Sequence, residues 1–430
     1  MSGDSSLWPG PPEAMRKVLG ASAWIEAMLE VECALAAAEE EAGVIGRGAA
    51  RAIADAAASL KIDLEALRAE AALAGTPVIP LVSALSAAAG PAGGFVHFGA
   101  TSQDVVDTAL ALVARRAASV LTAELAQVGR LLAALASDHR HSVMPGRTLL
   151  QQGSPTTFGL KAAGWLVAVV DAHGELLGAV RSLPIQLGGA VGTLAVLGER
   201  AHAVVADVAA RLGLPIPTLP WHANRIPVAR LGAALGAAAG TLGKIASDLV
   251  LLAQTEVAEI AERGEPGRGI SSAMPQKRNP AASIAAIAAA RRAAPVAAAL
   301  LSGLDHEHER AAGAWQAEAP LVVDVFGHVA LASAELRRAF EGIEVDGARM
   351  RANLDPSGAW AADAITAMLA PTLGRDAARD QIREAIARGA LRSDPRFAAL
   401  LADPLAAAGP VDALIDAALA RHADSELAES

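Results

Sequence analysis

A stretch of 36 residues, 103–138, constrains the fold of this chain more than any other. It contains no proline and a single glycine, Gly129, and apolar residues recur along it at helical spacing. At about 1.5 Å of rise per residue, it would form a helix roughly 54 Å long. Comparable alanine-rich stretches follow at 155–182, 225–262, 280–301 and 310–341. The pattern predicts a bundle of long helices.

The composition also favours an all-α fold. Hydrophobic residues make up 53% of the 430 residues but aromatic residues only 3%, because alanine supplies the excess. Such sequences favour close-packed helices over sheets. The long helices are apolar nearly all round, and a single layer of five helices cannot bury them on every side. We therefore expect the bundle to pack against copies of itself in a homo-oligomer.

Breaks in the helical pattern divide the chain into three predicted helical domains. Residues 1–100 form an N-terminal domain that ends in a loop-rich stretch, 74–100, punctuated by glycine and proline. Residues 101–341 form the central long-helix bundle, and residues 342–430 form a shorter and more polar C-terminal domain.

Charge and composition exclude several classes of protein. The net charge is −10 without a long basic run, so nucleic-acid binding is not expected. Prolines interrupt the longest run free of Asp, Glu, Lys and Arg, 71–103, and the N-terminus lacks the pattern of a signal peptide. Cys33 has no second cysteine to pair with. We expect a cytoplasmic protein that does not bind membranes.

Two segments place polar residues at predicted helix starts. Thr101 and Ser102 directly precede the 103–138 stretch, where their hydroxyls and backbone N–H groups could hold a carboxylate. The second segment, 146–159, contains Ser154 before Pro155, a signal of another capped helix start. Such helix starts are common, so neither segment by itself indicates a binding site.

A third segment, 269–280, combines two hydroxyls, a lysine, an arginine and an amide. Glycines just before it give the backbone freedom to move. Pro280 begins a helical pattern, so Asn279 occupies the expected N-cap, and Lys277 and Arg278 lie beside the positive end of the predicted helix. Free N–H groups and cations in one loop predict the binding of a small dianion.

The third segment resembles the signature loop of the fumarase/aspartase superfamily, usually G-S-S-x-M-P-x-K-x-N-P, with Ile270 in place of the leading glycine. Together the three segments are similar to the three signature regions of that superfamily, in order and at similar separations. The chain resembles most the 3-carboxy-cis,cis-muconate cycloisomerase branch. Stretches that carry this resemblance are 79–82, 96–104, 187–194, 220–222 and 308–310.

The resemblance implies an all-α homotetramer without an organic cofactor or metal, in which each active site draws the three regions from three subunits. The substrate would be a small anionic dicarboxylate. A run with two histidines between carboxylates, 305–310, has H-x-H spacing, which differs from the usual zinc motifs. We therefore expect no metal site there.

By resemblance, Ser271 would take a proton from the carbon next to a carboxylate, with its alkoxide stabilised by Lys277 and the N–H groups of the loop. Arg225 would hold the second carboxylate in a bidentate fork, although an arginine at a helix start is equally well explained as a surface residue. Donors to the dianion formed by proton loss would be Thr101, Ser102, Thr148, Lys277 and Asn279.

Three positions depart from the pattern of the superfamily. Leu149 and Gln152 occupy positions where many members carry histidine, and Gln316 stands where a further histidine is expected. Glutamine donates a hydrogen bond but cannot transfer a proton near neutral pH. General acid catalysis is worth roughly 10²–10⁴-fold, so its loss favours a leaving group that departs without a proton. His97 could serve as a substitute acid, as a substrate ligand or as a structural residue.

Nitrite leaves as a stable anion, and some members of the superfamily expel it from nitrosuccinate to give fumarate. We therefore predict a carbon–heteroatom lyase that eliminates a good leaving group, such as nitrite, from a 2-substituted succinate through a carbanion. One alternative is a lactonising 3-carboxy-cis,cis-muconate cycloisomerase. Another is a non-catalytic structural homologue, of which the lens crystallins are examples.

Overall fold

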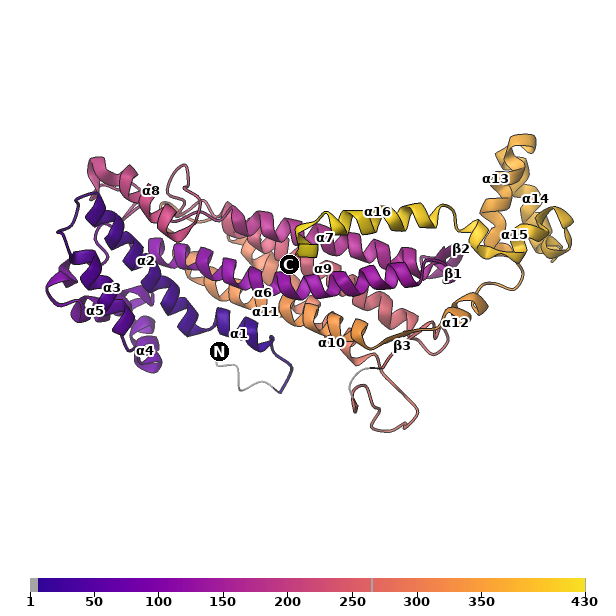
Figure 1. Ribbon diagram of the computed structural model, residues 1–430, viewed down its shortest axis with the longest axis horizontal. Helices are drawn as coiled ribbons and strands as arrows, with labels where there is room; N and C mark the ends of the chain where they lie inside the picture. The colour runs from indigo at the N-terminus through magenta and orange to yellow at the C-terminus, as the bar shows by residue number, and fades with distance from the viewer. Residues whose placement is uncertain (1–6, 264–265, 430) are drawn as a thin grey trace. The chain divides into compact units, whose positions relative to one another are not determined.

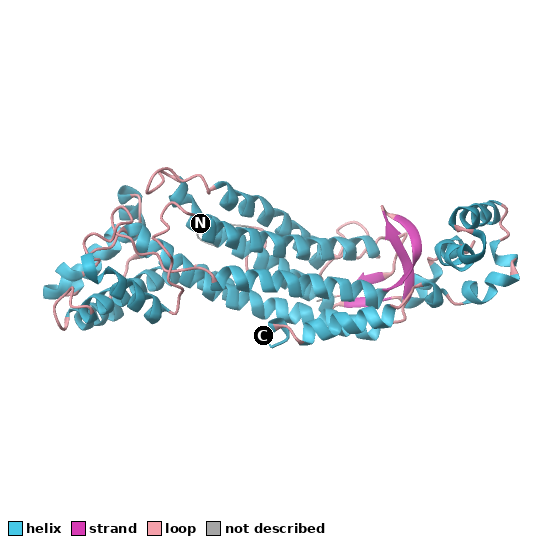
Figure 2. Cartoon of the chain, turned by 90° about the horizontal axis from the view of Figure 1, so that it is seen from above, coloured by secondary structure: helices cyan, strands magenta, loops and turns pink. Residues whose placement is uncertain are grey.

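The computed structural model describes residues 7–263 and 266–429. Helices account for most of them, and two antiparallel pairs of strands account for nearly all of the rest of the regular structure (Figure 2). The prediction of an all-α fold is confirmed. The long helices are α6 (Ser102–Asp138), α7 (Phe158–Arg181), α9 (Ile226–Leu252), α10 (Ala281–Ser302) and α11 (Ala314–Glu341), labelled in Figure 1.

The chain forms two compact units, and each of the five long helices contributes residues to both. Unit 1 consists of Met1–Thr122, Ala172–Gly240 and Ala289–Leu331, and unit 2 consists of Ala123–Asp171, Thr241–Ala288 and Ala332–Ser430. The division of the sequence into three successive domains stays a prediction.

Unit 1 contains the N-terminal helices, in which α2 packs against α3 and α8 (Figure 1). Their shared apolar core includes Ala36, Ile53 and Leu85. The side chain of Asp63 accepts the backbone N–H groups of Glu65 and Ala66 and so starts α4. The elements of this unit outside the long helices are α1 (Glu13–Leu19), α2 (Ala21–Glu41), α3 (Ala49–Ser59), α4 (Leu64–Ala74), α5 (Val78–Ala88), η1 (Gly90–Phe95), η2 (Gly198–Arg200) and α8 (Ala201–Leu212).

The expectation of a loop-rich stretch at 74–100 was wrong for its central part, which forms α5. Pro77 occupies the N-cap of this helix, and Pro80 lies in its first turn. Backbone N–H groups in a first turn have no partner within the helix, so proline is tolerated there.

Unit 2 contains both pairs of strands and the C-terminal helices. Apolar residues from β1 and from the C-terminal segment, among them Val143, Trp360 and Phe397, form one buried core cluster. The remaining elements of this unit are β1 (Val143–Thr148), β2 (Gln151–Thr157), β3 (Ile260–Glu262), β4 (Ile343–Val345), α12 (Gly347–Ala352), η3 (Ala359–Ala361), α13 (Ala362–Leu373), α14 (Arg375–Ala387), η4 (Leu391–Ser393), η5 (Pro395–Phe397), α15 (Ala398–Ala402), η6 (Pro404–Ala407), α16 (Val411–Ala423) and α17 (Glu426–Glu429).

The second polar segment forms a β-hairpin, where the sequence predicted a helix start at Pro155. Pro155 lies opposite Pro145 in the ladder of β1 and β2, and α7 begins only at Phe158. The hydroxyl of Thr157 accepts the backbone N–H of Leu160 at 3.1 Å, so Thr157 takes the capping role expected of Ser154.

By length and composition alone, the five long helices are apolar enough to cross a membrane. In each of these helices, the most apolar stretch of 18 residues is only partly buried within the single chain. The buried share of that stretch ranges from 33% to 67% among the five helices. A large apolar area on these helices is therefore left for other contacts.

Candidate functional site

The first polar segment is organised by the buried carboxylate of Asp104, in the first turn of α6. The carboxylate accepts the backbone N–H of Thr101 at 3.0 Å, which completes the cap of the helix. It also accepts the N–H groups of Gly188 and Gly189 at 3.0 and 2.9 Å, and lies 2.7 Å from Nε2 of His222. Asp104 therefore joins three segments of the sequence beside the half-buried side chain of Thr101.

Arg225 lies in a buried ion-pair network, so the expectation that it holds a substrate carboxylate is not supported. It is 1% exposed, and its guanidinium donates to both carboxylate oxygens of Asp107, at 2.8 and 2.9 Å, and to Glu318 at 3.0 Å. Burial alone would lower the pKa of Arg225, but the two carboxylates outweigh that effect and raise it. With its donors committed to Asp107 and Glu318, the guanidinium has a structural role.

His97 is paired with a buried carboxylate on α2. Its Nδ1 lies 2.7 Å from Oε1 of Glu32, and its φ of 60° places the backbone in the left-handed region. Burial lowers the pKa of His97, but the Glu32 carboxylate more than compensates, so that the net pKa is raised. This contact fixes the ring just before the Thr101–Ser102 segment.

The β-hairpin carries Thr148 and Gln152. Thr148 is exposed at the end of β1, opposite Gln151, and the side-chain amide of Gln152 donates to the backbone oxygen of Asn353 at 2.8 Å. Close to the turn of the hairpin, Arg147 donates two hydrogen bonds, of 2.6 and 2.9 Å, to the buried carboxylate of Glu259. The hairpin is therefore firmly anchored in unit 2.

In the third segment, the backbone folds around the hydroxyl of Ser271. Its Oγ accepts the backbone N–H groups of Met274, at 3.0 Å, and Ala273, at 3.3 Å. The N–H of Asn279 donates to the backbone oxygen of Gly269 at 2.8 Å and so closes the loop. Ser271 is half-buried, and Lys277 is exposed. Two oriented N–H groups would stabilise negative charge on Oγ of Ser271.

The positive end of α10 is already occupied, which corrects the expected role of this helix start in anion binding. The carboxylate of Glu262 accepts the N–H groups of Ala282 and Ser283, at 2.7 and 3.1 Å, and the Ser283 hydroxyl at 2.9 Å. A bound carboxylate neutralises the partial positive charge of a helix N-terminus. Any dianion at this loop would therefore depend on the cations and N–H groups of the loop itself.

The predicted site residues are divided between the two units. Unit 1 contains His97, Thr101, Ser102 and Arg225, whereas unit 2 contains Thr148, Gln152, Ser271, Lys277 and Asn279. Sequence reasoning missed Asp104 and Asp107 as the carboxylates that position the first segment. Their acidic side chains on one face of a strongly apolar helix were the available signal.

Comparison with known proteins places these segments in a family. A lyase family model matches residues 10–294. The chain belongs to this lyase family.

Two curated relatives of this lyase differ in the reaction they are named for. It is 40% identical to a 3-carboxy-cis,cis-muconate cycloisomerase of Bradyrhizobium diazoefficiens, over 94% of both chains. It is 42% identical to a nitrosuccinate lyase of Streptomyces davaonensis, over 89% of this chain and 84% of the relative.

Solved structures agree with this assignment. The lyase matches the crystal structure of a 3-carboxy-cis,cis-muconate lactonizing enzyme from Pseudomonas putida with a TM-score of 0.86 and 35% identity, covering 96% of this chain and 97% of the other. It also matches the crystal structure of a fumarate lyase from Mesorhizobium sp. BNC1, with a TM-score of 0.86 and 34% identity. This match covers 95% of this chain and 98% of the other. The lyase is therefore a member of the fumarase/aspartase superfamily.

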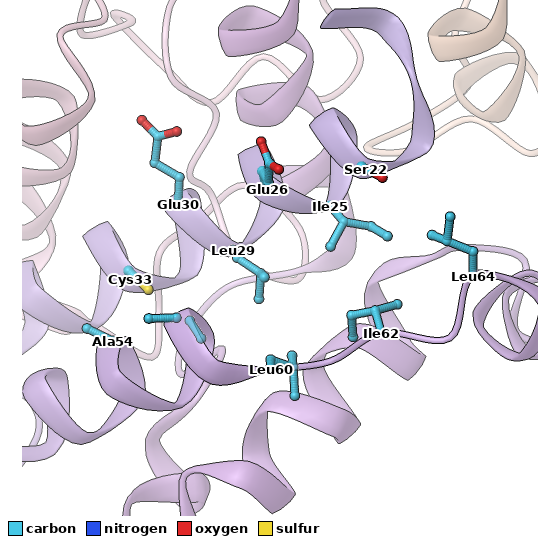
Figure 3. A pocket seen from close by; sticks show the side chains of 12 residues that line it. Ser22, Ile25, Glu26, Leu29, Glu30, Cys33, Ala54, Leu60, Ile62 and Leu64 are labelled. Atoms are coloured by element: carbon cyan, nitrogen blue, oxygen red, sulfur yellow. The ribbon is translucent and has the colours of Figure 1, made fainter. Parts of the chain in front are cut away.

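A cavity of about 620 Å³ lies between α2, α3 and the segment that leads to α4 (Figure 3). Its lining combines apolar side chains such as Leu29 and Leu60 with the carboxylates of Glu26 and Glu30, and no basic residue lines it. An anionic substrate would be repelled there, so this cavity does not fit the dicarboxylate predicted for the lyase.

The histidine-containing run 305–310 holds a buried imidazole. The side chain of His306 is buried, and its Nε2 lies 3.4 Å from Oε1 of Glu318. The pKa of His306 is lowered, mainly by burial and secondly by the positive charge of Arg225. Within residues 7–263 and 266–429, no group of three His, Cys, Asp or Glu residues could hold a metal ion.

Proposed function

We propose that this lyase removes a good leaving group, with nitrite as the first candidate, from a 2-substituted succinate to give fumarate. Ser271, as the alkoxide, takes a proton from the carbon next to a carboxylate. The electron pair of that C–H bond then forms the carbon–carbon double bond. The C–N bond breaks, and nitrite departs with the electrons of that bond.

The observation that carries this proposal is the environment of Ser271. Serine is a weak base unless its alkoxide is stabilised. The N–H groups of Ala273 and Met274 already converge on Oγ, and Lys277 lies in the same loop. Removing one oriented donor from a site that stabilises an oxyanion typically costs about 10²–10³-fold in rate, so such a pair is a substantial aid to ionisation.

The choice of leaving group rests on the side chains at three positions. Leu149, Gln152 and Gln316 provide no group that could protonate an amine or a hydroxide as it departs. Nitrite needs no such proton, and the nitro group also acidifies the neighbouring C–H bonds. The 42% identity to a protein named nitrosuccinate lyase supports the same reaction.

The proposed substrate site also contains Thr101, Ser102, Thr148, Gln152 and Asn279 as hydrogen-bond donors to the two carboxylates. We propose that the chain acts as a cytoplasmic homotetramer in which several subunits contribute to each site. The apolar area that the long helices leave uncovered in a single chain supports such an assembly.

Incubation with nitrosuccinate tests the proposal, with nitrite and fumarate measured separately. Equal amounts of the two products are expected. Wild-type protein that releases neither would rule the reaction out. A Ser271→Ala variant serves as the matched blank, because non-enzymatic loss of nitrite would appear in it as well.

A second candidate is lactonisation of 3-carboxy-cis,cis-muconate. The 40% identity to a cycloisomerase over 94% of both chains favours it. Loss of the diene absorbance of carboxymuconate, with no release of nitrite from nitrosuccinate, would select this reaction. Measuring both substrates on one preparation therefore decides between the two candidates.

A further inference from the structure

Arg310, in unit 1, has an unsatisfied guanidinium group. Its Nε donates to Oε1 of Gln103 at 3.1 Å. Its terminal Nη2 is buried and has no hydrogen-bond partner among the described residues. Cationic donors are rarely buried without an acceptor, because they lose their hydration and gain nothing in return. Another molecule could supply the acceptor that Nη2 of Arg310 lacks.

The orientation of Arg310 is set by Gln103, which is fully buried. The side-chain nitrogen of Gln103 donates to Oδ2 of Asp107 at 3.1 Å and to the backbone oxygen of His222 at 2.8 Å. Both of its donor hydrogens are therefore used, and its oxygen has to face Arg310. The buried network around Asp107 thus fixes one edge of the guanidinium and leaves the other free.

Gln103 joins Arg310 to the first polar segment. Gln103 is the second residue of α6 and follows Thr101 and Ser102 directly in the sequence. Thr101 and Ser102 are half-buried and carry hydroxyl donors. Gln103 therefore links the Arg310 cation to a segment that carries two hydroxyl donors.

Arg225, in the same unit, differs from Arg310 because it is paired with carboxylates. Its guanidinium is paired with the carboxylates of Asp107 and Glu318, whereas Arg310 contacts the neutral amide of Gln103. Arg310 forms no direct ion pair among the described residues, and a planar guanidinium edge matches a carboxylate in shape and in donor spacing.

We propose that the free edge of Arg310 binds one carboxylate of the dicarboxylate substrate, with Thr101 and Ser102 as donors to the same group. Arg310 thus takes the role that the sequence suggested for Arg225. This inference deepens the proposed function and rests on it for the class of substrate, but not for the leaving group.

The test measures binding without turnover, using succinate and fumarate as probes and isothermal calorimetry on the full-length protein in its native assembly. Arg310→Gln is expected to weaken binding of both probes at least tenfold, and Arg310→Lys, which keeps the charge but loses the planar fork, several-fold. The matched control is Arg115→Gln, because Arg115 lies on α6 in the same unit and bonds only the backbone oxygens of Leu212 and Gly213. Its affinity for the probes should equal that of the wild type.

Three results would overturn the inference. The first is wild-type affinity in a folded Arg310→Gln protein, and the second is the absence of succinate and fumarate binding in the wild type. The third is a change in assembly mass by light scattering with unchanged affinity, because Nη2 would then pair with a second copy. If Arg310→Gln does not fold, the affinity of Arg310→Lys decides. Probe binding that depends on Arg310, without release of nitrite from nitrosuccinate, would refute the proposed function and leave this inference standing.

Discussion

The Nε2 atom of His222 lies 2.7 Å from Oδ1 of Asp104, and both side chains are buried. Asp104 belongs to the first turn of α6, whereas His222 follows Trp221 just before α9. The same carboxylate also holds the N–H groups of Gly188 and Gly189. One side chain therefore fixes the position of two distant segments relative to the start of α6.

Replacing Asp104 by asparagine should destabilise unit 1. Asparagine keeps the shape but loses the charge and one acceptor oxygen, which leaves buried N–H groups without a partner. Leaving a buried donor without its acceptor typically costs about 1–3 kcal/mol for each donor. Urea unfolding followed by circular dichroism measures the loss. Asp55→Asn is the control, because Asp55 forms only an exposed pair with Arg51 and should change stability by less than about 0.5 kcal/mol.

Ser271→Ala should abolish most of the activity, whereas Ser272→Ala should not. Only Oγ of Ser271 is held by two backbone N–H groups, and Ser272 is exposed in the same loop. We expect kcat for nitrosuccinate to fall by about 10³-fold or more in the first variant and by less than about tenfold in the second. Equal losses in both would contradict the assignment of Ser271 as the base.

Stability should fall as the pH rises from about 4.5 to about 8, because of Glu39. Glu39 is fully buried, and neither carboxylate oxygen has a hydrogen-bond partner among the described residues. Burial first, and the neighbouring Glu32 second, raise its pKa to about 8 from an ordinary value of 4.5. Between these values the folded protein binds one more proton than the unfolded chain. Each pH unit therefore costs at most about 1.4 kcal/mol of folding free energy.

The matched pair of variants for this pH dependence is Glu39→Gln and Glu41→Gln. Glu41 lies on the same helix but is exposed, so its replacement should leave the slope of stability against pH unchanged. Glu39→Gln should flatten that slope and raise the free energy of unfolding above pH 8. His97 also has a raised pKa, so it too makes stability fall as the pH rises. This contribution to the slope of stability against pH remains in both variants. Identical slopes in the two variants would show that Glu39 is ionised in the folded protein.

The long helices could be predicted from the sequence because their signals are local. The sequence analysis placed the longest helix at 103–138, and the structure has α6 at Ser102–Asp138. An uninterrupted apolar period without proline leaves little choice of backbone conformation. The superfamily was likewise recognisable, since the 269–280 segment carries its signature in consecutive residues.

The remaining features depend on contacts between distant residues. Arg225 gave no sign that Asp107 and Glu318, each about a hundred positions away, would occupy its donors. Nor did the start of α10 reveal that Glu262 would cap it from 20 residues upstream. A sequence pattern identifies residue types that could bind an anion, but only tertiary packing decides which of them are already paired.

The turn of the β-hairpin leads to a last prediction, because leucine is disfavoured in the backbone conformation that both of its residues adopt. Leu149 and Leu150 form the two-residue turn between Thr148 and Gln151, with φ of 52° and 63°, and are 96% and 72% exposed. Turns with two positive φ values favour Asn-Gly, whereas leucine there costs roughly 1–2 kcal/mol per residue. Such strain is typical of functional sites. We therefore predict that the leucines serve a contact outside the single chain and not the turn itself.

Replacing Leu149-Leu150 by Asn-Gly should accordingly relieve the strain and impair function. We expect the unfolding midpoint to stay the same or rise, while kcat/KM for nitrosuccinate falls at least tenfold, because the hairpin also presents Thr148 and Gln152. Leu73→Asn is the control, because Leu73 is equally exposed, at 91%, but lies on α4. Full activity in the Asn-Gly variant would mean that the apolar tip makes no functional contact and that the strain is incidental. A lower midpoint with full activity would show, in addition, that the leucines stabilise the hairpin after all.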